Sequence, residues 1–257
     1  MVTTQSLLQD SISISGPPNA PPIVFLHGLH LGRYSWKDHI ELLVPRFRCV
    51  TLDLPRHGTM SEVPFDDEHI MQQLDYLFAS VLRRPALLVG YSLGGFIAIL
   101  YAARAQEQTS GLILTGATLD LTKWRRLAYR VLISVGARIP SRIFEACSRA
   151  FFYATLPKAL AQAVSSHSFD QHAFNEAVAL LEGCEFSRLL ERYRKPVLII
   201  NGQYDIIFRP QARHFARKVN AHVEVAPGSD HVFPLRRPDI FSERVASFYE
   251  NLNVGTS

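Results

Sequence analysis

The sequence predicts an α/β fold with a mostly parallel central sheet, flanking helices and an inserted helical cap. Short, fully apolar runs, typical of strands buried on both faces, alternate with helical patterns. Almost every run ends in a Gly or Pro turn, where polar residues gather. One long helix-patterned segment interrupts this alternation. We therefore assign residues 1–116 and 188–257 to the α/β core and residues 117–187 to the cap.

Six apolar runs are the predicted strands. In chain order they are Ile23–Leu26, Cys49–Leu52, Ala86–Val89, Leu112–Leu114, Val197–Ile200 and the weaker Val223–Val225. Core helices are predicted at about Asp66–Arg84, Gly94–Gln106, Arg209–Lys218 and Asp239–Asn251. In an open parallel sheet, ligands bind beyond the carboxyl ends of the strands, so we look for the site in the turns that follow these runs.

Length and composition exclude several classes of protein. The 257 residues suffice for one large domain that buries roughly three quarters of its unfolded surface. With 47% hydrophobic and 19% charged residues, the chain is not of the disordered class. Cys49, Cys147 and Cys184 have no zinc or redox spacing, and we expect the last two to be reduced core residues of the cap.

The ends and the apolar segments of the chain predict a cytoplasmic protein with no integral membrane contact. The first 15 residues lack a basic segment followed by an apolar run, which a signal peptide would need. The most apolar stretch, residues 85–103, contains Tyr91, Ser92 and three glycines, and it suits a membrane span poorly.

Ser92 is the predicted nucleophile. The segment Gly90–Gly95 follows an apolar strand and opens a helical pattern, which is the context of a G-x-S-x-G nucleophile elbow. The glycines two residues on either side allow the close backbone approach that this strained turn requires. The elbow projects the serine hydroxyl into the cleft and aims the Leu93 N–H at a developing oxyanion.

A serine nucleophile needs a histidine base and a carboxylate that orients it. His231 follows the last strand and Asp205 follows the strand ending at Ile200, so both lie at the same sheet edge as Ser92. We predict these two residues as base and acid. Asp120, after the Leu112–Leu114 run, is an alternative acid, whereas Asp230 is interpreted as a loop residue.

The loop after the first buried strand should supply the second oxyanion donor, for which we predict the Leu29 N–H. Two donors matter because one oxyanion hydrogen bond contributes roughly 3–4 kcal/mol to catalysis. His27 is expected to support this loop rather than titrate, and His57 to be a structural turn residue. His30 is a possible pocket residue.

Together these residues resemble the α/β-hydrolase superfamily, over nearly the whole chain. The matching motifs are His27-Gly28 with Trp36, Asp53 through Ser61, Gly90–Gly95, Pro196–Asp205 and Asp230-His231. The resemblance implies a Ser-Asp-His hydrolase with a helical cap and no cofactor.

The chain departs from the family pattern in three places. Arg56 and Asp230 stand where relatives often carry glycine, and the short lead-in before Pro17 leaves room for a reduced first strand. Haloalkane dehalogenases and epoxide hydrolases use an aspartate nucleophile, so Ser92 argues against both activities.

The cap is expected to choose the substrate. Residues 117–160 carry eight Lys and Arg against two acidic residues. Three interpretations remain open: a solvated basic face, attraction of an anionic substrate, or contact with an anionic membrane surface. We predict no nucleic acid partner, because no binding motif accompanies the charge, and no metal, because His167 and His172 lack a matching ligand set. The predicted pocket residues are His30, Tyr91, Trp124, Phe144, Phe151 and Phe152.

Three functions follow, in order of preference. The first is serine hydrolysis of a carboxylic ester or thioester with a largely hydrophobic substrate. The second keeps the site but acts on an anionic diketo-acid-type substrate, as a C–C bond hydrolase or lyase. The third is a non-catalytic binding protein of the same fold.

Overall fold

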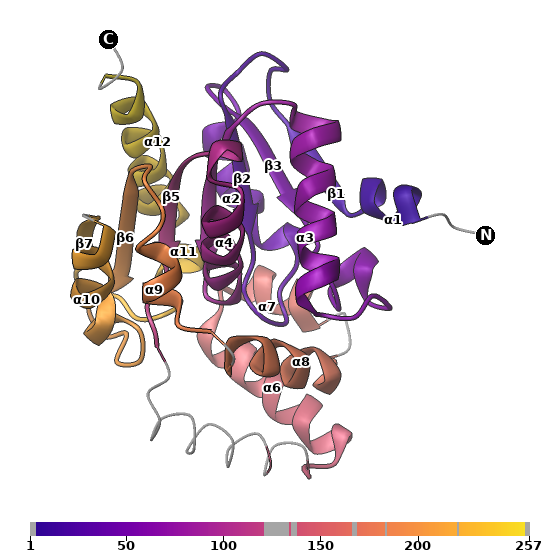
Figure 1. Ribbon diagram of the computed structural model, residues 1–257. Coiled ribbons are helices and arrows are strands. Elements are labelled where there is room, and N and C mark those ends of the chain that lie inside the picture. Colours follow the sequence, from indigo (N-terminus) through magenta and orange to yellow (C-terminus); the bar gives the residue numbers. More distant parts are fainter. Residues whose placement is uncertain are drawn as a thin grey trace.

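The computed structural model describes residues 4–120, 134, 138–165, 169–182, 184–219 and 221–254 (Figure 1). A seven-stranded sheet runs through the core in the order β1-β3-β2-β4-β5-β6-β7. The strands are β1 (Ile12–Ser15), β2 (Pro22–Leu26), β3 (Arg48–Leu52), β4 (Ala86–Tyr91), β5 (Thr109–Thr115), β6 (Val197–Gly202) and β7 (His222–Ala226). Only β1 pairs antiparallel, and the predicted fold class is confirmed.

Helices cover both faces of this sheet. The core helices are α1 (Thr4–Asp10), α2 (Lys37–Leu43), α3 (Asp67–Tyr76), α4 (Leu93–Arg104), α9 (Phe186–Leu190), α10 (Arg209–Val219), α11 (Phe233–Arg236) and α12 (Pro238–Val254). Residues of α3, α4, α9 and α10 pack on one face with Val24 and Leu26, and residues of α2, α11 and α12 pack on the other with Ile23 and Phe25. Alternate residues of β2 thus serve opposite cores, which explains its continuous apolar run.

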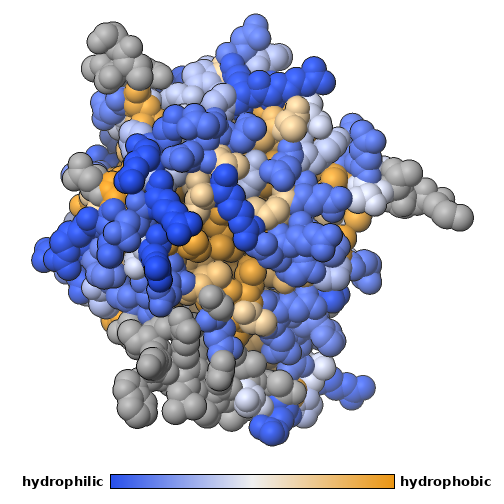
Figure 2. Space-filling view, in the orientation of Figure 1, coloured by the Kyte–Doolittle hydropathy of each residue, from blue (hydrophilic) through white to orange (hydrophobic). Residues whose placement is uncertain are grey.

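The helix α4 lies in the middle of one face and is apolar in all directions. Ten of its twelve residues are buried. Figure 2 shows apolar side chains gathered in the middle of this face, where Figure 1 shows α4, with hydrophilic side chains around them. This central position rigidly fixes the start of α4, where Ser92 lies.

One core segment agrees with the prediction and another differs from it. Among the described residues, the lead-in to β2 consists of α1 and the single short strand β1, in keeping with the reduced first strand expected from the sequence. The predicted helix Asp66–Arg84 divides into α3 and a π-helical segment, Leu77–Leu82, that ends at Arg83 with φ 55°. Asp66 caps α3 through its carboxylate, which accepts the His69 N–H.

Three further helices lie beyond the carboxyl ends of the strands (Figure 1). They are α6 (Ser141–Thr155), α7 (Lys158–Ser165) and α8 (Gln171–Glu182). The short α9 that follows packs on α4 instead, with the rings of Phe186 and Phe96 4.6 Å apart. Among the described residues no helix is both long and apolar enough to cross a membrane.

Candidate active site

Ser92 occupies a strained turn between β4 and α4. Its φ of 52° and ψ of −118° lie in a region that non-glycine residues rarely adopt. A Cβ atom at Gly94 would overlap the Leu26 carbonyl, and one at Gly90 would overlap the backbone of Gly95. The two glycines therefore allow the close backbone approach that presents Ser92 at the carboxyl end of β4, where its N–H donates to the Thr115 carbonyl of β5.

His231 and Asp205 form a hydrogen-bonded pair. Asp205 is buried after β6, and its Oδ2 lies 2.9 Å from Nδ1 of the half-buried His231. Its Oδ1 accepts the N–H groups of Ile207 and Phe208. Burial disfavours the Asp205 carboxylate, but the hydrogen bond and charge of His231 and the two N–H groups outweigh it and lower the Asp205 pKa.

The His231 ring is held between two aromatic rings and one glycine. The rings of Tyr91 and Phe208 have centroids 5.2 and 4.9 Å from it. Gly116, which follows β5 at φ 62°, lies against the imidazole, so that a Cβ atom there would overlap it. The ring is thus fixed on three sides as well as through Nδ1.

Gly116→Ala is expected to reduce turnover about 100-fold while the protein still folds. The added methyl group displaces the imidazole, and a misplacement of about 1 Å costs roughly two orders of magnitude in rate. Steady-state hydrolysis of a p-nitrophenyl ester, with circular dichroism of the same sample, checks this. Wild-type turnover in the folded variant would contradict the packing described.

The alternative acids have other partners. Asp120 accepts the Ser187 N–H at the start of α9. Asp230 accepts the Val232 N–H and forms an ion pair with Arg236. Of the three carboxylates, only Asp205 is hydrogen-bonded to His231.

The two predicted oxyanion donors come from different elements. Leu93 is the first residue of α4, so its N–H is one of the four that have no partner within the helix. Leu29 follows β2, and it lines the same cavity as Ser92. The loop that carries Leu29 is therefore a second element of the site.

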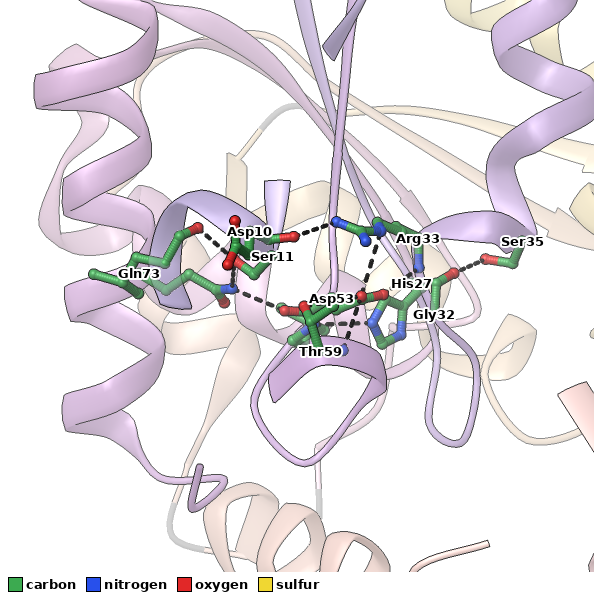
Figure 3. Close-up of polar contacts among 11 residues, drawn as sticks. Asp10, Ser11, His27, Gly32, Arg33, Ser35, Asp53, Thr59 and Gln73 are labelled. Carbon is green, nitrogen blue, oxygen red and sulfur yellow. Dashed lines mark hydrogen bonds and ion pairs between the residues drawn. The ribbon is translucent and has the colours of Figure 1, made fainter. Parts of the chain in front are cut away.

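Buried polar groups hold this loop in place. Figure 3 shows Asp53 at the centre, where its carboxylate accepts the Arg33 and Thr59 N–H groups and its carbonyl accepts the Gln73 amide. His27 Nε2 accepts the Leu54 N–H. These contacts link the loop after β2 to the loop after β3.

Two more histidines pack beside it. His57 Nε2 accepts the His30 N–H, and its other ring nitrogen lies 2.7 Å from the Pro55 carbonyl. Burial lowers the pKa of His27 to about 4 and that of His57 to about 3. Both rings are neutral at pH 7, in agreement with the structural roles expected for them. Burial is also the main cause that lowers the pKa of His30 to about 3.

A cavity of about 430 Å³ brings these parts together. Ser92 and His231 line it, as do five of the predicted pocket residues: His30, Tyr91, Phe144, Phe151 and Phe152. Trp124 lies outside the described residues. The sequence analysis missed Leu31, Ile139, Cys147, Ser148, Thr155, Leu156, Phe174, Val232 and Leu235, which also line the cavity.

The cavity corrects one expectation about the cap and bears on a question that the sequence left open. Cys147 was expected in a packed core, but it is exposed, because α6 turns this face toward the cavity. No Lys or Arg is among the described lining residues. Arg149 instead binds within the cap, to Glu145 and the Ser165 carbonyl. Lys123, Arg125, Arg126 and Arg130 lie outside the described residues.

Residues 23–244 match the Alpha/beta hydrolase family. The chain belongs to this family. It is therefore a hydrolase, as the names of its relatives also indicate.

Two relatives and one solved structure illustrate the similarity. The pimeloyl-[acyl-carrier protein] methyl ester esterase of Nitrosospira multiformis is 24% identical over 93% of this chain and 98% of its own length. A Haemophilus influenzae protein, provisionally named as a 2-succinyl-6-hydroxy-2,4-cyclohexadiene-1-carboxylate synthase, is 45% identical over 38% of this chain and 42% of its own length. The structure of MenH from S. aureus has a TM-score of 0.79 at 21% identity, and the match covers 95% of this chain and 99% of that one.

In this alpha/beta hydrolase, Arg56 joins the cap to the core. It has a φ of 63°, in the left-handed region where relatives often carry glycine. Its guanidinium donates two hydrogen bonds, of 3.0 and 2.8 Å, to the Glu176 carboxylate of α8, which also accepts the Phe65 N–H. The Arg56 hydrogen bond holds the Glu176 pKa below its usual 4.5, against a smaller effect of burial.

We expect the contribution of Glu176 to stability to disappear in acid. The pKa of Glu176 is lower in the folded state than in the unfolded state, so its carboxylate stabilises the protein at any pH above the unfolded-state pKa. This stabilisation is lost as the pH falls through the folded-state pKa. Glu176→Gln should lower Tm by about 2–4 °C at pH 7, which is about 1 kcal/mol for a pair this exposed. The difference from wild type should shrink at pH 4. Glu243→Gln, at an exposed position of α12, is the control; an equal effect there would contradict the assignment.

Proposed function

We propose that this protein hydrolyses a carboxylic ester or thioester with a largely hydrophobic acyl group, through Ser92, His231 and Asp205. The observation that carries the proposal is that His231, which is hydrogen-bonded to Asp205, lines the same apolar cavity as Ser92. Ser92 Oγ attacks the carbonyl carbon while His231 takes the hydroxyl proton. The N–H groups of Leu29 and Leu93 stabilise the oxyanion that forms.

The remaining steps return the enzyme to its starting state. His231 gives its proton to the leaving alcohol or thiol, and the acyl group stays on Ser92. A water molecule then loses a proton to His231 and attacks the acyl carbon. His231 returns that proton to Ser92 Oγ as the acyl–oxygen bond breaks, which releases the acid and restores the serine. Asp205 holds the imidazole in the useful tautomer throughout.

Acyl chain length tests the hydrophobic part of this proposal. Each methylene that enters the cavity contributes about 0.8 kcal/mol, so kcat/KM should rise about fourfold per CH₂ across p-nitrophenyl acetate, butyrate and hexanoate. The rise should stop where the cavity is full. A flat or falling series would contradict an acyl-binding role for the cavity.

The similarity to the Haemophilus influenzae synthase favours a second candidate, a C–C bond hydrolase or lyase acting on an anionic substrate. Against it, no described lining residue carries a positive charge. A panel of diketo acids beside the p-nitrophenyl esters separates the two candidates. Turnover of esters alone supports the first, and turnover of diketo acids alone supports the second.

A further inference from the structure

Arg236, the last residue of α11, lies between the cap and the loop of His231. Its Nε donates a hydrogen bond of 2.7 Å to the Thr155 carbonyl, and its Nη1 donates one of 2.7 Å to the Asp230 carboxylate. Thr155 is the last residue of α6, and Asp230 directly precedes His231. One side chain therefore links the end of α6, which is 81 residues away from Arg236 in the chain, to the loop of His231.

The Thr155 contact holds the wall of the cavity. Thr155 lines the cavity together with Phe151 and Phe152 of the same helix. Its carbonyl is one of the last four of α6, which have no partner within the helix and carry the negative end of the helix dipole. A guanidinium at this position satisfies the carbonyl and fixes the end of the helix.

The Asp230 contact holds the loop of the histidine. Oδ2 of Asp230 binds Arg236, while Oδ1 accepts the Val232 N–H at 3.0 Å. The carboxylate thus spans the backbone on both sides of His231. Val232 and Leu235 also line the cavity, so this short segment is itself part of the wall.

We propose that Arg236 is a positioning residue that couples the acyl-binding wall of α6 to the placement of His231. The guanidinium suits this role because its N–H groups point in fixed, different directions, whereas a lysine ammonium is a single point charge. The proposal rests on the proposed function, since it assumes that His231 is the base and that the cavity takes the acyl group. The proposal adds Arg236, which is not among the described residues that line the cavity.

Three variants separate the two contacts. Arg236→Met removes both, and Asp230→Asn removes the ion pair but keeps the Thr155 contact. Arg237→Met is the matched control, because Arg237 is the next residue and its guanidinium pairs with the exposed Asp239. The readouts are kcat on p-nitrophenyl acetate, which reports His231, and the hexanoate-to-acetate ratio of kcat/KM, which reports the wall.

Arg236→Met is expected to lower both readouts about fivefold, a size typical of one partly exposed charged contact. Asp230→Asn should lower kcat on acetate and leave the ratio unchanged, and Arg237→Met should change neither. The coupling is overturned if Arg236→Met matches Arg237→Met, or if it leaves the ratio at the wild-type value.

Hydrogen–deuterium exchange keeps the test independent of catalysis. Arg236→Met should speed exchange at the end of α6 and at residues 230–236 together, by about fivefold, and Arg237→Met should not. A wild-type enzyme without ester turnover would refute the proposed function, while unchanged exchange in Arg236→Met would refute the coupling.

Discussion

Ser92→Ala is expected to lower ester hydrolysis by about 10⁵- to 10⁶-fold, the loss found when a serine nucleophile is removed from an intact triad. The hydroxyl oxygen forms the covalent bond to the acyl group, and alanine has no atom that replaces it. Labelling with a fluorophosphonate probe, followed by intact mass, measures the same property directly. Wild type should gain one adduct and Ser92→Ala none.

Ser148→Ala provides the matched control for this experiment. Ser148 is on α6 and lines the same cavity, so the probe reaches it as readily, but no histidine is bonded to it among the described contacts. The variant should keep both the adduct and most of the turnover. Unchanged melting temperatures in both variants would show that the fold is intact. Wild-type turnover in Ser92→Ala would refute the assignment of Ser92 as the nucleophile.

The strands and the elbow could be predicted because local constraints determine them. A parallel strand buried on both faces must be apolar at every position, and Ile23–Leu26 and Ala86–Val89 show this without reference to the rest of the chain. The glycines around Ser92 are recognisable from their spacing in the sequence, and the structure shows that backbone contacts with Leu26 and Gly95 leave no space for a side chain there. The strand patterns also led to the prediction of Asp205 and His231 as acid and base, because each residue follows a recognisable strand.

Contacts between distant residues could not be predicted in this way. Arg56 and Glu176 are 120 residues apart, and nothing in either segment marks the other as its partner. The orientation of α6 was equally hidden, because Cys147 suits a packed core as well as a cavity wall. The short α2 and α11 were missed because their burial depends on α12, whose residue Phe241 lies 6.0 Å from Phe233 between ring centroids.

Asp205→Asn is expected to lower kcat by about 10⁴-fold while the protein still folds. The asparagine carbonyl can still accept the Ile207 and Phe208 N–H groups, so the loop keeps its shape. The amide N–H of the asparagine, however, donates a hydrogen bond to His231 Nδ1, whereas the wild-type carboxylate accepts the N–H of that ring nitrogen. The imidazole then carries its proton on Nε2 and has no lone pair for the Ser92 proton.

The pH dependence of the wild type should follow from the same contact. Because the folded-state pKa of Asp205 is lowered, the carboxylate stays ionised in mild acid, and its support of the fold is lost only as pH falls through that lowered value. The melting temperature of the wild type should therefore fall as the pH is lowered from 7 to 3. The melting temperature of Asp205→Asn should fall less over the same range.

Asp120→Asn decides between the two acids that the sequence left open. Asp120 receives the Ser187 N–H, which an asparagine carbonyl can also accept, so this variant should fold and retain turnover within about twofold. If Asp120→Asn were inactive and Asp205→Asn active, the acid would come from the end of β5 instead of β6. The 2.9 Å contact between Asp205 and His231 argues for the first outcome, because the described contacts of the Asp120 carboxylate include the Ser187 N–H but not His231.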